Sequence, residues 1–122
     1  MTDVFLVSAA RTAVGAFGGS LKDQKPGDLG AHVIRAAVER AGVSADLVGH
    51  VVMGNVVATE PRDAYVARIA AVQAGIPIEV PAMTVNRLCS SGMQAIVSAA
   101  QMIKLGDCEV AVGGGVEVMS RA

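Results

Sequence analysis

The residue with the clearest chemical potential in this sequence is Cys89, in the stretch VNRLCSSGMQAIVSAAQ, residues 85–101. An apolar run precedes it, and Ser90, Ser91 and Gly92 lead from it into a helical pattern. A thiol at a helix N-terminus faces unpaired backbone N–H groups and the positive end of the helix dipole, which stabilise a thiolate. Backbone N–H groups there, including that of Cys89, can also stabilise the oxyanion formed when sulfur attacks a carbonyl. The position therefore permits a nucleophile, although cysteine by type alone favours a small buried core residue.

The other titratable candidates have weaker positions. Cys108 lies beyond the same predicted helix, and about sixteen helical residues of 1.5 Å each separate it from Cys89 by roughly 24 Å. No disulfide spans that distance, so we interpret Cys108 as a core residue at the start of a strand. His32 falls on the polar face of a predicted helix, where it is solvated, and His50 opens a strand without an evident partner. Neither histidine is placed to take the proton of a cysteine nucleophile.

Composition excludes several classes of protein. Hydrophobic residues make up 52% of the 122 residues and charged residues 17%, which is incompatible with a disordered chain. The net charge of −1 shows no excess of basic residues that would favour binding to nucleic acid. Two cysteines without zinc-type spacing predict no metal site. The start, MTDVFLVSAARTAVG, lacks a basic lead and a long apolar run, so we expect a cytoplasmic protein without membrane segments.

Strands and helices alternate along the chain, which indicates one α/β domain with a mainly parallel sheet. The third helix is apolar around most of its circumference, so we expect it to be buried. A sheet on each side would bury it, and this chain can supply only one of them. The predicted strands cover 4–11, 50–57, 80–86 and 109–115, and the predicted helices cover 28–41, 62–74 and 90–105.

The glycine run at 113–115 is the other conspicuous motif. It follows a strand, but no further glycine completes a dinucleotide fingerprint, and the Gly-Lys-Ser/Thr ending of a Walker loop is absent. We therefore expect close packing or a tight turn at this run rather than a phosphate site.

Three stretches together resemble the signature sequences of thiolases, in the expected order. They are VSAARTAVGAFGGSL (7–21), VNRLCSSGMQAI (85–96) and GGGVEVMS (113–120). The resemblance implies a fold of two similar α/β halves with helices between two sheets. Residues 1–122 would form the N-terminal half, without the CoA-binding loop region and the C-terminal half. One face of the third helix would then be uncovered.

The same resemblance implies the chemistry. In thiolases the cysteine matched by Cys89 is acylated by an acyl-CoA or a 3-ketoacyl-CoA, and the acyl group then passes to a second thioester or to CoA. The histidine base and the second cysteine belong to the C-terminal half, so Cys108 is not that second cysteine. We therefore expect an acetyl-CoA C-acetyltransferase or 3-ketoacyl-CoA thiolase that uses CoA as a substrate, needs no cofactor, and forms a homodimer or homotetramer. The 122 residues alone are expected to be inactive.

Two other interpretations remain open. One is a different condensing enzyme of the same superfamily, similar to a ketosynthase, which would differ in its distant catalytic partners. The other is a non-catalytic dimerisation or packing module, with Cys89 as a core residue. Within the thiolases, the segment ATEPRDAYVARIAAVQAG (58–75) resembles bacterial β-ketothiolases that accept somewhat longer acyl chains.

Overall fold

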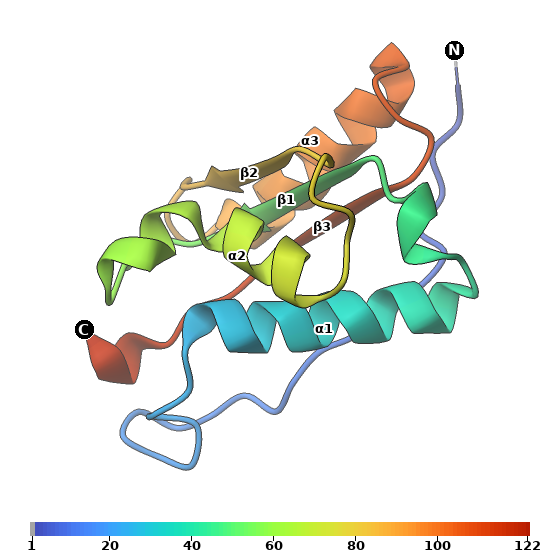
Figure 1. The fold of residues 1–122 in the computed structure, drawn as a ribbon. Coiled ribbons are helices and arrows are strands. Elements are labelled where there is room, and N and C mark those ends of the chain that lie inside the picture. Colours follow the sequence, from blue (N-terminus) through green and yellow to red (C-terminus); the bar gives the residue numbers. More distant parts are fainter. Residues whose placement is uncertain (1) are drawn as a thin grey trace.

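The computed structural model describes residues 2–122, which form three α-helices around a small parallel sheet (Figure 1). Short 3-10 turns at Ala45–Leu47, Pro61–Tyr65 and Met119–Arg121 connect or end the elements. Within residues 2–122, no helix is long and apolar enough to cross a bilayer. The helices are α1 (Pro26–Ala41), α2 (Val66–Gln73) and α3 (Ser91–Leu105), and the strands are β1 (His50–Gly54), β2 (Ala82–Val85) and β3 (Ala111–Gly115).

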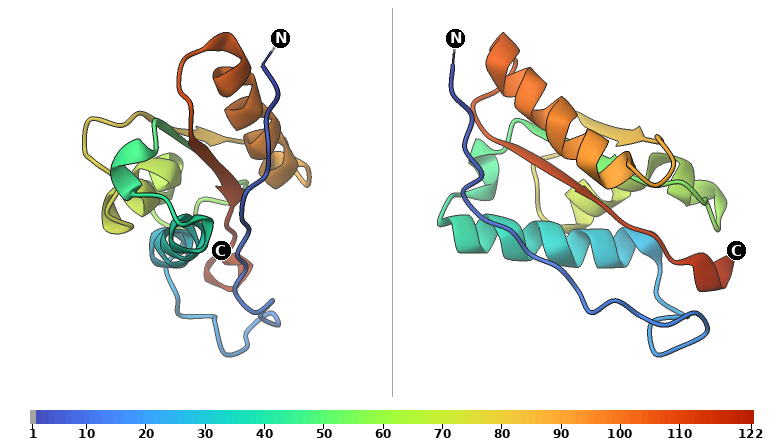
Figure 2. Two further views of the ribbon diagram at one scale, coloured as in Figure 1. Left: turned by 90° about the vertical axis from the view of Figure 1, so that its right-hand side faces the viewer. Right: turned by 180° about the vertical axis from the view of Figure 1, so that it is seen from behind.

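The sheet has the order β2-β1-β3, with both pairs parallel, as the alternation of elements predicted. Helices α1 and α2 cover one face and α3 covers the other (Figures 1 and 2). Because side chains alternate along a strand, Val51 and Met53 of β1 pack in the cluster of α1 and α2, whereas Val52 packs against Ala95 and Ala99 of α3. The central strand β1 therefore joins two separate apolar clusters.

Most predicted elements are confirmed, with shifted ends. Helix α1 begins at Pro26, two residues before the predicted start, because proline suits the first helical turn. Gly42 and Gly106 end α1 and α3 with left-handed φ values of 69° and 84°, a conformation that glycine adopts without a steric cost. The predicted helix 62–74 is divided into the 3-10 turn at Pro61–Tyr65 and helix α2.

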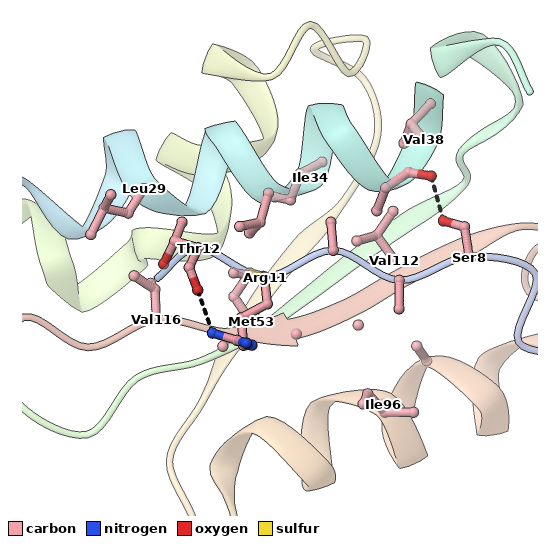
Figure 3. Close-up of a pocket in the computed structure, with 18 of the residues that line it drawn as sticks. Ser8, Arg11, Thr12, Leu29, Ile34, Val38, Met53, Ile96, Val112 and Val116 are labelled. Atoms are coloured by element: carbon pink, nitrogen blue, oxygen red, sulfur yellow. Dashed lines mark hydrogen bonds between the residues drawn. The ribbon is translucent and has the colours of Figure 1, made fainter. Parts of the chain in front are cut away.

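The predicted strand at 4–11 is wrong. Residues 2–16 form no strand, and Phe5, Leu6 and Val7 are 70–85% exposed. The segment runs past α1 and β3 (Figure 2), but a cavity of about 800 Å³ separates it from the free edge of β3 (Figure 3). Side chains anchor it instead, since the Ser8 hydroxyl donates to the Ala37 carbonyl at 2.5 Å and Arg40 donates to the Ala9 carbonyl at 3.0 Å. An apolar run favours a strand only where a neighbouring edge comes within hydrogen-bonding reach.

Helix α3 is less buried than its composition predicted. Its buried residues are Ser91, Ala95 and Ala99, whereas Met93 is 66% exposed and Leu105 79% exposed. The sheet covers only one side of the helix, so the apolar residues on the other side have nothing to pack against. An uncovered face on this helix is what the thiolase resemblance implied for an N-terminal half.

Candidate active site

Cys89 lies in the loop that connects the carboxyl end of β2 to the start of α3, and its side chain is exposed. Cys89 is therefore not part of the core that residues 2–122 form. The 15-residue helix α3 begins two residues later, at Ser91, so the thiol lies next to the helix N-terminus as predicted. The two N–H groups that follow the thiol are already paired, that of Ser90 with the Arg87 carbonyl at 3.2 Å and that of Ser91 with the Leu88 carbonyl at 3.0 Å.

The residue before the thiol has a strained backbone. Leu88 has a φ of 51° and is the only non-glycine residue with positive φ among residues 2–122. The left-handed conformation costs an L-residue with a Cβ about 1–2 kcal/mol. The Leu88 N–H donates to the Asn86 side-chain oxygen at 3.0 Å, which supports the turn from its other side. Neighbouring interactions therefore hold this loop in a conformation that Leu88 would not prefer by itself.

Ser91 supplies most of these interactions. Its side chain accepts a hydrogen bond from the Arg87 N–H at 2.7 Å and donates one to the Leu88 carbonyl at 2.6 Å. The Ser91 N–H donates to the same carbonyl at 3.0 Å. With only 4% of its surface exposed, Ser91 is shielded from competing water.

Glycines in the sheet allow the start of α3 to come unusually close. A Cβ at Gly54, the last residue of β1, would lie 2.6 Å from the Ser91 carbonyl carbon. A Cβ at Gly113 would lie 2.8 Å from the Ile96 Cα, and one at Gly115 would lie 3.3 Å from the Gly92 Cα. The glycine run thus serves close packing, as its pattern predicted.

A polar network ties the carboxyl ends of β1 and β3 together. The Glu117 carboxylate accepts hydrogen bonds from the Val56 and Val57 N–H groups, at 3.1 and 2.7 Å, and from the Asn55 amide at 3.2 Å. The buried Asn55 amide also donates to the Val116 carbonyl at 2.9 Å. Asn55 and Glu117 are 62 positions apart, so nothing in the local sequence pattern links them or predicts this contact.

Cys108 differs from Cys89 in both exposure and charge environment. It is half-buried and lies between the end of α3 and the start of β3, close to the position that the sequence predicted. Burial and, to a smaller extent, the Asp107 carboxylate raise the pKa of the Cys108 thiol. Both effects disfavour a thiolate there.

Neither histidine lies at the start of α3. His32 is exposed on α1, on the opposite face of the sheet from α3, as predicted for a solvated histidine. His50 opens β1, and the five residues of that strand separate it by about 13 Å from the Gly54 end that contacts Ser91. The His50 Nδ1 atom is buried and has no hydrogen-bond partner within residues 2–122. These residues also contain no cluster of three or more His, Cys, Asp or Glu side chains that could hold a metal.

The large cavity is not a pocket for the thiol. Its walls are the N-terminal segment, α1, the free edge of β3, and α3 residues from Ile96 onwards (Figure 3). Cys89 does not line it. The exposed loop that carries Cys89 therefore lies apart from this cavity.

The chain resembles curated proteins over nearly its whole length. The chain is 65% identical over 120 residues to beta-ketothiolase BktB of Cupriavidus necator, covering 98% of this chain and 30% of that protein. It is 54% identical over 122 residues to an acetyl-CoA acetyltransferase of the same organism, covering all of this chain and 31% of that protein. The chain thus spans about 30% of the length of these curated relatives.

Solved structures match equally well. The crystal structure of human mitochondrial 3-ketoacyl-CoA thiolase in complex with CoA superposes with a TM-score of 0.94 at 45% identity, covering 97% of this chain and 30% of that one. The Bacillus anthracis acetyl-CoA acetyltransferase gives a TM-score of 0.89 at 46% identity, covering 94% and 29% of the two chains. The family model of the thiolase N-terminal domain matches residues 4–122. The chain therefore belongs to the thiolase family and corresponds to its N-terminal domain.

Proposed function

We propose that this chain supplies the nucleophile of a thiolase, with Cys89 as the residue that becomes acylated. The observation that carries the proposal is the exposed thiol at the start of α3, in a fold that superposes on thiolases. The reaction would be the condensation of two acyl-CoA molecules, or the cleavage of a 3-ketoacyl-CoA by CoA. The names of the relatives, beta-ketothiolase and acetyl-CoA acetyltransferase, support this class of acyltransferase.

The first chemical step would begin at the exposed Cys89 thiol. The Cys89 thiolate attacks the carbonyl carbon of the acyl-CoA thioester and forms a new carbon–sulfur bond. The bond from that carbon to the CoA sulfur then breaks, and CoA leaves as a thiolate that takes up a proton. Between these events the carbonyl oxygen carries negative charge, which the Cys89 N–H can stabilise. The acyl group finally passes to the α-carbon of a second acyl-CoA, or to CoA.

The proton transfers need groups beyond those found beside Cys89. His32 and His50 lie away from the start of α3, and Cys108 lies beyond its far end. We propose that a histidine base and a second cysteine come from polypeptide equivalent to the remaining 70% of the relatives. Purified residues 1–122 should therefore show no thiolysis of acetoacetyl-CoA, and turnover by them would contradict this part of the proposal.

Acylation of Cys89 is the direct test. The complete protein is exposed briefly to acetyl-CoA, digested and examined by mass spectrometry. An acetyl group on the peptide that contains Cys89, absent in Cys89→Ser, is the expected result. No adduct would favour the non-catalytic packing module. An adduct without condensation of two acetyl-CoA molecules or cleavage of acetoacetyl-CoA would favour a condensing enzyme similar to a ketosynthase.

The substrate and the assembly are finer parts of the same proposal. The human relative whose structure contains CoA supports acyl-CoA substrates, and the resemblance of residues 58–75 to bacterial β-ketothiolases supports acyl chains longer than acetyl. The dimer or tetramer that the family resemblance implies stays a prediction. Rates with acyl-CoA substrates of increasing length and light scattering of the complete protein test these two points. A cytoplasmic location stays a prediction that cell fractionation can check.

A further inference from the structure

Ser91 is unusual among the polar residues of the structure because it is buried next to an exposed reactive group. Only Asn55, Asp63 and Ser91 are buried polar or charged residues within residues 2–122. The hydroxyl of Ser91 bonds to Arg87 and Leu88, so its interactions reach backwards across Cys89. The loop that carries the thiol is thus closed on itself by a side chain that water cannot easily reach.

The Leu88 carbonyl is the group that these bonds hold most firmly. It accepts from the Ser91 hydroxyl at 2.6 Å and from the Ser91 N–H at 3.0 Å. This carbonyl and the Cys89 N–H belong to one planar peptide unit, and residues 2–122 contain no cis peptide bond. In a trans unit the C=O and N–H bonds point in opposite directions. Holding the carbonyl against Ser91 therefore fixes the direction of the Cys89 N–H.

We infer that Ser91 is a positioning residue that aims the Cys89 N–H at the oxygen of the acyl group. The inference rests on the proposed function, since it needs an oxyanion to form at Cys89. Ser91 acts through the peptide unit and does not touch the substrate. The left-handed φ of Leu88 fits this role, because without the two bonds to its carbonyl the peptide unit would relax towards a more favourable conformation.

Two reactions of the same thiol separate positioning from simple structural support. Transfer of an acetyl group from acetyl-CoA needs the oxyanion donor, whereas alkylation by iodoacetamide at the same sulfur forms no oxyanion. In the complete protein, Ser91→Ala should lower the rate of acetyl transfer to Cys89 about 10- to 100-fold. The alkylation rate of Cys89 should change by less than about threefold, because the thiol stays exposed. Cys108 serves as an internal reference for alkylation in every sample.

The neighbouring serine offers a matched control. Ser90 is exposed, and its side chain makes no capping hydrogen bond, so Ser90→Ala removes the same hydroxyl group without loosening the loop. Ser90→Ala should leave the rates of acetyl transfer and of alkylation at Cys89 unchanged. Ser91→Thr retains a hydroxyl and should recover at least part of the acetyl transfer. Equal loss of both reactions in Ser91→Ala, or no loss of either, would overturn the inference.

Leu88 provides a second route if Ser91→Ala does not fold. Asparagine tolerates the left-handed region and valine does not, so Leu88→Asn should keep acetyl transfer while Leu88→Val loses it about 10-fold or more. Equal rates in the two variants would overturn the inference.

If the unmodified protein takes no acetyl group at Cys89, the proposed function fails and this inference fails with it. If it is acetylated but Ser91→Ala is acetylated equally fast, only the positioning role is lost.

Discussion

A cysteine lies near each end of α3, and the two thiols differ in exposure and in their charged neighbours. Cys89 precedes the helix in an exposed loop, whereas Cys108 follows it in a half-buried position next to Asp107. The Cys89 thiol is exposed beside the start of α3, while burial and a neighbouring carboxylate raise the pKa of the Cys108 thiol and disfavour a thiolate there. Residue type alone therefore says little about the reactivity of a cysteine. The exposure of its thiol and the end of the helix that it adjoins must also be known.

Glycines at or next to the two ends of β1 approach the segments that carry the two cysteines. A Cβ at Gly54 would strike the backbone of Ser91, and a Cβ at Gly49 would lie 2.6 Å from the Cys108 Cβ. Close approach by itself therefore does not distinguish the two cysteines. What distinguishes them is the loop at residues 86–90, which bends outwards at Leu88 and presents the thiol to solvent.

The largest effect should come from removing each thiol in turn. Cys89→Ser in the complete protein should lower the rate of acetoacetyl-CoA thiolysis by about 10⁴-fold or more, because the nucleophile is lost. Cys108→Ser should change the rate less than about threefold, because its thiol plays no part in the proposed chemistry. Steady-state kinetics with both variants checks the contrast, and equal losses would remove the functional difference between the two cysteines.

A smaller effect should follow from disturbing the contact under the start of α3. Gly54→Ala places a methyl group 2.6 Å from the Ser91 carbonyl carbon, so either the helix or the strand must move. We expect the free energy of unfolding to fall by about 1–3 kcal/mol. Gly114→Ala is the control, since its methyl group would meet only the flexible end of the Met53 side chain, with the sulfur at 3.4 Å and the Cε at 3.8 Å.

Urea unfolding of both variants measures this difference. If Gly54→Ala is as stable as Gly114→Ala, the backbone contact between β1 and α3 is looser than the structure shows. A fall in the acetyl transfer rate of Gly54→Ala beyond what its lower stability explains would show that the strand also helps to place Cys89.

The smallest effect concerns the pH dependence of Cys108. Because burial and Asp107 raise its pKa, the rate of iodoacetamide alkylation at Cys108 should reach its midpoint above the ordinary value for thiols, about 8.5. Asp107→Asn removes the smaller of the two causes, so the midpoint should move down while staying raised by burial. Alkylation rates between neutral and alkaline pH, followed for each cysteine by mass spectrometry, check this shift. An unchanged midpoint would exclude Asp107 as a cause.

The same pKa shift has a consequence for folding. A thiol whose pKa is raised in the folded state contributes stability that is complete below the pKa of the unfolded chain. That contribution is lost as pH rises through the higher value of the folded state. Alkaline pH should therefore weaken the region around Cys108 through its thiol.

The sequence predicted the elements that depend on local patterns and missed those that depend on distant partners. Gly42 and Gly106 marked the ends of α1 and α3 because a left-handed cap is a local requirement. The position of Cys89 beside α3 was equally local. In contrast, the apolar run at 4–11 reads as a strand in any local window, and only the distance to β3 shows that it does not pair.

The hydrogen bonds that hold the loop around Cys89 also could not be predicted from the sequence. Ser91 reads as a small residue in a helical pattern, and nothing in its type shows that its hydroxyl turns back to Arg87 and Leu88. Asn55 and Glu117 meet only because β1 and β3 are neighbours in the sheet. Local composition indicates that a helix follows the loop, whereas three-dimensional packing decides which side chains hold the loop in place.

The strand order β2-β1-β3 has a consequence for synthesis of the chain. Asn55, just after β1, and Val116, just after β3, are 61 residues apart in sequence, so the central strand lacks one neighbour until the ribosome has added that length. At about 5–20 residues per second this takes roughly 3–12 seconds. Until α3 is complete at Leu105, Val52, fully buried in the structure, has no helix to cover it. The nascent chain therefore passes through a period in which its most buried strand is open to chaperones and to aggregation.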